Sequence, residues 1–194
     1  MSKSFEQFVE YLEKIITKEE PLRQPPIVIV HCPVKLIKDI YISLVAKLKE
    51  LKVKHGQWNY YLINMEKKMF DILAELDYIG GDNLALTCSR EDLKKDLSAS
   101  VLKEMVSSVE SEIDRIIAAN TSSQHPPFVI LMNIHGCYDY IQTKDIISRI
   151  INKERILILV LYLELGLSEI NPEEDESYKL ANYNVHPVHI SSLK

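Results

Sequence analysis

Histidine and cysteine side chains stand close together at two places in the sequence. His31 and Cys32 follow one short apolar run, and His135 and Cys137 follow another. Imidazole and thiolate groups are ligands for soft metals, and a thiol beside an imidazole can act as a nucleophile. If the two runs form neighbouring strands, these four residues could make a metal site or an activated thiol in a small hydrolase.

A plainer interpretation fits the same four residues. Each cysteine is then a small buried side chain, and each histidine forms hydrogen bonds with the backbone of its loop. Neither pair has the local spacing of a known metal or thiol motif. We favour this interpretation, and we therefore assign no catalytic residue, no resident metal and no cofactor.

The turn after the first apolar run lacks what phosphate binding requires. It reads HCPVKLIKD, without a glycine, and Pro33 has no N–H group to donate. Phosphate-binding turns use glycines and free backbone N–H groups, and the motifs GxxxxGK[ST] and GxGxxG are absent from the sequence. Asn133 ends the third apolar run, where an amide is a poor Mg²⁺ ligand. These features argue against nucleotide hydrolysis by a P-loop mechanism.

Acidic residues are concentrated near the C-terminus. Residues 168–177 hold five acids and no base, namely Glu169, Glu173, Glu174, Asp175 and Glu176. We expect an acidic loop over 165–180 that is either simply solvated or in contact with a partner. The segment lacks the alternating ligands and turn glycine of a calcium loop, so a basic protein surface is the better functional interpretation.

Two further histidines lie in the last apolar segment, 184–190. His186 and His189 are three residues apart, so on a strand their side chains point to opposite faces and suit one metal poorly. Pro187 between them predicts an edge strand. An edge strand offers unpaired backbone groups, so this segment is also a candidate surface for a partner.

The elements that position these residues alternate along the chain. Apolar spacing predicts helices over residues 4–18, 34–54, 65–79, 90–119 and 141–152. Short apolar runs predict strands over residues 27–30, 57–64, 128–133, 155–163 and 184–190. This alternation predicts a single α/β domain over 1–194, with helices on both faces of a mostly parallel sheet of about five strands. The strand order is expected to be RecA-like or similar, without a P-loop.

Local signals mark several of the expected boundaries. Ser4 and Gln7 have capping-box spacing, Pro33 suits the first position of a helix, and His55-Gly56 is a helix stop. The 90–119 helix would be about 45 Å long. We therefore expect it to project from the domain or to pack along an entire flank.

Charge and cysteine usage restrict the partners and the compartment. The net charge is −5, and it lies in the acidic segment, so we expect neither nucleic acid nor a membrane as a partner. Direct DNA binding would depend on one basic helix face, made of Lys47, Lys49, Lys52 and Lys54. Three cysteines without a CxxC motif, no signal peptide and no membrane-length apolar run indicate a cytoplasmic protein with reduced thiols.

The segment PFVILMNIHGCYDYIQTKDIISRIINKERILILVLYLE is similar to the central part of one protein family. This family is the B component of BREX (bacteriophage exclusion) systems, also called DUF1788. The similarity lies in an apolar strand, a turn with Gly136, the aromatic pair Tyr138 and Tyr140, a short helix and a second apolar strand. Gly166, the tail YKLANYNVHPVHI and the N-terminal PPIVIVHCP fit the same arrangement.

The resemblance implies a function of the whole chain and no site residues. It implies a non-enzymatic adaptor or scaffold in a phage-defence system, which binds another protein of that system. Such systems encode a DNA methyltransferase, a large ATPase and the phosphatase-fold protein PglZ, and PglZ is our candidate partner.

Overall fold

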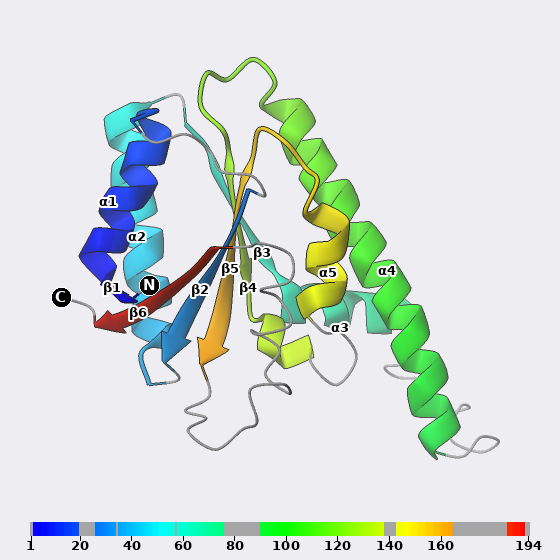
Figure 1. The fold of residues 1–194 in the computed structure, drawn as a ribbon. Coiled ribbons are helices and arrows are strands. Elements are labelled where there is room, and N and C mark those ends of the chain that lie inside the picture. The colour runs from blue at the N-terminus through cyan, green and yellow to red at the C-terminus, as the bar shows by residue number, and fades with distance from the viewer. Residues whose placement is uncertain are drawn as a thin grey trace.

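The computed structural model describes residues 2–19, 26–33, 35–56, 58–75, 90–137, 143–164 and 186–192 (Figure 1). The strands are β1 (Ser2–Ser4), β2 (Ile27–Pro33), β3 (Tyr60–Asn64), β4 (Phe128–Met132), β5 (Leu157–Glu164) and β6 (His186–Ser192). The helices are α1 (Phe5–Ile16), α2 (Ile37–His55), α3 (Met65–Glu75), α4 (Arg90–Ala119) and α5 (Thr143–Ile150). A short 3-10 turn, Ile134–Cys137, follows β4.

All neighbouring strands of the sheet are parallel. Their spatial order is β1-β6-β2-β5-β4-β3. When the five longer strands are counted along the chain as 1 to 5, this order is 5-1-4-3-2, which is the RecA-like order. The predicted α/β class is confirmed, and the carboxyl ends of these strands meet at one edge.

Helices cover both faces of the sheet, as the buried strands require. Figure 1 shows α1 and α2 on one face and α3, α4 and α5 on the other. Side chains alternate along β2, so Ile27 and Ile29 join the core under α3–α5. Val28 and Val30 join the core under α1 and α2. A strand buried on both faces must be apolar throughout, and this explains the run IVIV.

Several local predictions are confirmed. Ser4 and Gln7 form a capping box at the start of α1, and Gly56 ends α2 with φ +47°. The long helix has the predicted bounds, Arg90–Ala119. One stripe of α4 packs on the sheet through Val101, Met105, Val109, Ile113 and Ile116. Figure 1 shows its N-terminal end extending past the carboxyl edge of the sheet.

Two predictions at strand ends are wrong. Pro33 is the last residue of β2, and α2 begins only at Ile37. The C-terminal strand β6 lies between β1 and β2, because Ser2 pairs with His189. Pro187 precedes His189, the first residue of β6 that pairs with β1, so the ladder between β1 and β6 does not need the N–H donor that the proline lacks. The predicted acidic loop lies outside the described residues, including Glu173, Glu174, Asp175 and Glu176.

Candidate functional site

The carboxyl edge of the sheet does not bring the two cysteines together. The strands β2 and β4 are not neighbours, because β5 lies between them. Cys32 belongs to the core under α1 and α2, and Cys137 belongs to the core under α3–α5. The sheet therefore separates the two sulfur atoms. The four-residue site that the sequence allowed is not formed by these cysteines.

Each cysteine is buried in a setting that suits packing. The Cys32 thiol donates to the carbonyl oxygen of Val30 at 3.5 Å. Burial and the nearby Glu66 carboxylate raise the pKa of Cys137 to about 11, so its thiol is protonated at neutral pH. Within the described ranges, no three His, Cys, Asp or Glu residues are grouped in a way that could hold a metal ion. The side chains of His135 and His186 lie outside the described part of the structure.

Three aromatic rings lie side by side at the carboxyl end of β2. His31 pairs in register with Tyr162 of β5 and with His189 of β6. The imidazoles of His31 and His189 are stacked, with ring centres 4.3 Å apart and an angle of 17° between their planes. The Tyr162 ring lies 5.3 Å from His31, and His31 is only 4% exposed. We call His31, Tyr162 and His189 the ring cluster.

The ring cluster changes the interpretation of both histidines. His189 contacts another ring, so it is not the free edge-strand surface that the sequence suggested. Tyr162 was not identified as a site residue, because only the strand order brings it beside His31. In RecA-like proteins the phosphate loop follows the strand that corresponds to β2. Here β2 ends with the buried residues His31 and Cys32, followed by Pro33.

A cavity of about 310 Å³ lies at the same edge, on the face of the sheet that α1 and α2 cover. It is lined by Ile37, Lys38, Tyr41, Asn64, Met132, Asn133 and Leu161. The Asn64 side-chain oxygen accepts the Lys67 N–H at 3.1 Å and lies 3.5 Å from the Asn133 amide nitrogen. Asn133 adopts φ +56°, a left-handed conformation that asparagine tolerates. Asn64 caps the start of α3 and Asn133 forms the turn after β4, so both side chains have structural roles.

Two of the four lysines on the basic face of α2 form ion pairs with neighbouring glutamates. Lys47 pairs with Glu50 at 2.7 Å, and Lys54 pairs with Glu13 of α1 at 2.6 Å. Lys52 donates to the side chain of Asn59 at 3.1 Å. Cations held in this way contribute less to a phosphate-binding surface, so this face gives DNA binding little support.

Glu13 is the centre of this ionic network. It accepts hydrogen bonds from Lys54 and lies 3.0 Å from His55. These hydrogen bonds lower the pKa of the Glu13 carboxyl below its ordinary value. The network therefore ties α1 to the end of α2.

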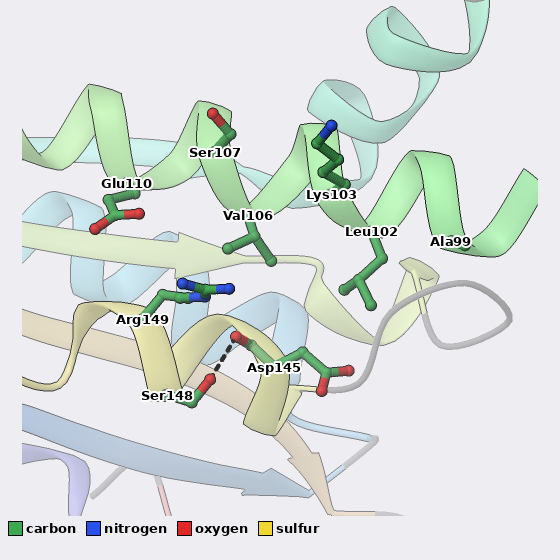
Figure 2. Close-up of a pocket in the computed structure, with 9 residues that line it drawn as sticks. All are labelled: Ala99, Leu102, Lys103, Val106, Ser107, Glu110, Asp145, Ser148 and Arg149. Carbon is green, nitrogen blue, oxygen red and sulfur yellow. Dashed lines mark hydrogen bonds between the residues drawn. The ribbon is translucent and has the colours of Figure 1, made fainter.

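A groove of about 520 Å³ runs between α4 and α5 on the opposite layer. Its lining residues are Ala99, Leu102, Lys103, Val106, Ser107, Glu110, Asp145, Ser148 and Arg149. Figure 2 shows Leu102 and Val106 pointing from α4 toward α5, and Arg149 reaching from α5 toward α4. We call this surface the α4–α5 groove.

Among the described helices, none has the length and apolar composition that crossing a bilayer requires. Comparison of the chain with protein-family models, with curated proteins and with solved structures found no significant match.

Proposed function

We propose that this chain is a non-catalytic cytoplasmic adaptor built on a RecA-like sheet. In this proposal it belongs to a BREX-like phage-defence system and binds another protein of that system, with PglZ as the first candidate. The resemblance of the segment from Pro127 to Glu164 to the BREX B component supports membership of a BREX-like system. The geometry of the site supports a non-catalytic role.

The observation that carries the proposal is the construction of the sheet edge at β2. In a parallel α/β sheet, ligands bind beyond the carboxyl ends of the strands. Here that end has Pro33 in place of a glycine-rich turn, and the ring cluster fills one face of it. An anion at this place would meet stacked rings where a phosphate loop offers N–H groups. A scaffold with this edge is better suited to macromolecular contacts than to phosphate chemistry.

The alternative of a metal or thiol hydrolase has less support. A metal site made of the four residues needs Cys32 and Cys137 near each other, and the sheet stands between them. The raised pKa of Cys137 also makes it a poor nucleophile at neutral pH. Metal analysis of the purified protein tests this alternative, since stoichiometric zinc that is lost in Cys32→Ala/Cys137→Ala would support an enzyme.

Co-purification tests the adaptor proposal directly. The tagged chain is produced together with the products of its neighbouring genes, and complexes are isolated by affinity and size-exclusion chromatography. We expect one neighbouring gene product to elute with the chain in a fixed ratio. An untagged chain serves as the control for non-specific retention.

Two results would contradict the adaptor proposal. One is the recovery of the chain alone from cells that produce every neighbouring protein. The other is saturable binding of Mg-ATP to the isolated chain, measured by titration calorimetry, because the proposal rests on a β2 end that cannot hold a triphosphate.

A further inference from the structure

The α4–α5 groove has an apolar floor that follows one side of a helix. Ala99, Leu102 and Val106 are three and four residues apart, so they lie on one stripe of α4. Leu102 and Val106 are half-buried and pack partly against the core, while Ala99 is exposed. From Ala99 to Val106 the stripe is about 10 Å long, which is two helical turns. An apolar stripe of this length matches the contact face of a short helix.

Two cations border this floor, and neither has an ionic partner among the described residues. Within the described ranges, neither Lys103 nor Arg149 forms an ion pair or a side-chain hydrogen bond, and both are exposed. Of the two acids that line the groove, Glu110 pairs with Lys153 at 3.3 Å, and Asp145 takes part in an interaction of its own. Lys103 and Arg149 are therefore two positive charges with which the carboxylates of a ligand in the groove could pair.

We propose that the α4–α5 groove binds an amphipathic helix of a partner protein, with acidic residues beside its apolar stripe. This inference rests on the proposed adaptor function and names the surface and the chemistry through which it would act. Apolar side chains of the partner helix pack on Leu102 and Val106. The ridges of side chains on one helix then fit between those of the other, as in ordinary helix packing.

The charges give the docked helix its specificity. A carboxylate of the partner pairs with Arg149, whose guanidinium can donate two parallel hydrogen bonds, and a second carboxylate pairs with Lys103. The two cations lie on different helices, so an acidic helix would contact both walls of the groove. A basic helix would meet both cations without compensation.

Synthetic helices test the groove without knowledge of the partner. The probe is a labelled amphipathic peptide of about 12 residues with leucines on one stripe and glutamates beside it. The matched control peptide has lysines in place of the glutamates. By fluorescence anisotropy at low salt, we expect the glutamate peptide to bind at least about tenfold more tightly than the lysine peptide.

Matched variants locate this binding on the chain. Lys103→Glu/Arg149→Glu should remove the preference for the glutamate peptide. Lys35→Glu/Lys49→Glu makes the same change in net charge at two exposed lysines outside the groove, and it should leave the preference intact. The inference is overturned by no binding of the glutamate peptide, by equal binding of both peptides, or by an equal response of the two variants.

The same variants separate this inference from the adaptor proposal. If a complex with a neighbouring gene product is recovered, Lys103→Glu/Arg149→Glu should abolish it and Lys35→Glu/Lys49→Glu should preserve it. A complex that survives the first variant overturns the groove inference and leaves the adaptor proposal standing. Circular dichroism of each variant confirms that a lost complex does not reflect unfolding.

Discussion

Grooves between helices occur on both faces of the sheet, and they differ in how their charges are used. The groove between α1 and α2 has a volume of about 330 Å³, and its two lysines, Lys47 and Lys54, both pair with a glutamate. The α4–α5 groove is larger, at about 520 Å³, and its cations Lys103 and Arg149 have no ion pair in the described part of the chain.

This difference separates a closed helix layer from one that can accept another element. On the α1–α2 side, Lys54 pairs with Glu13 across the two helices and Lys47 pairs with Glu50 within α2, so both lysines of that groove have an ionic partner. On the α4–α5 side, the eight-residue α5 lies against the thirty-residue α4, so among the described elements α5 covers only part of the long helix on that side. The two grooves therefore differ less in volume than in whether their lysine and arginine side chains have an ionic partner among the described residues.

The largest expected effect comes from the core beneath the α1–α2 groove. Phe8 is fully buried, so Phe8→Ala should lower the free energy of unfolding by about 3–5 kcal/mol. Val106→Ala in the α4–α5 groove removes a half-buried side chain and should cost about 1 kcal/mol or less. Urea unfolding followed by the fluorescence of Trp58, the only tryptophan, measures both. Equal losses would show that the two layers do not differ as we describe.

A backbone change at the end of α2 should have an intermediate effect. Gly56 has φ +47°, and nothing lies within 4 Å of the position that a Cβ atom would take. Gly56→Ala should therefore cost about 1–2 kcal/mol through backbone strain alone. Thermal unfolding by circular dichroism measures this loss, with Lys49→Ala on the same helix as a control. A neutral Gly56→Ala would mean that the end of α2 adapts without the left-handed residue.

The ionic network of the α1–α2 layer should contribute a smaller, pH-dependent amount. Glu13→Gln removes the pairs with Lys54 and His55 and should cost about 0.2–1 kcal/mol near neutral pH. The folded pKa of Glu13 lies below its ordinary value of 4.5, so the contribution is complete above that value. It is lost as the pH falls through the lowered pKa. Urea midpoints of the two proteins should therefore converge in acid, and a constant difference would contradict this origin.

The smallest effect on stability should come from the α4–α5 groove itself. Lys103→Ala/Arg149→Ala breaks no ion pair among the described residues and adds no like charge to the groove, so the free energy of unfolding should change by no more than about 0.5 kcal/mol. In contrast, Lys54→Glu breaks the pair with Glu13 and places two like charges together. Urea unfolding of both variants compares them. A large loss in the groove variant would show that these cations support the fold.

Local signals predicted most of the elements, and the errors arose where distant segments meet. The apolar spacing of α4 and the capping box at Ser4 depend on residues within one helix, so a linear sequence contains them. The ring cluster depends on β2 lying between β5 and β6, and no local pattern specifies that order. The edge assignment of β6 was wrong because β1 is three residues long and carries no apolar signal.

The sequence left open a metal site at the cysteines for a related reason. A sequence shows that Cys32 and Cys137 each follow an apolar strand, but it does not show which face of the sheet each side chain enters. Strand alternation places neighbouring residues on opposite faces, so the exact register decides the outcome. Only the folded chain reveals that the sheet separates the two thiols.

The sequence by itself determined the alternation of helices and strands, the burial of the strands on both faces, and the lack of a glycine-rich phosphate turn. These properties follow from side-chain polarity and backbone freedom over a few residues. Tertiary structure decided the strand order, the stacking of His31 on His189 and the placement of Lys103 and Arg149 on the two walls of the α4–α5 groove. They arise from contacts between residues far apart in the chain, and such contacts form only when the whole sheet is assembled.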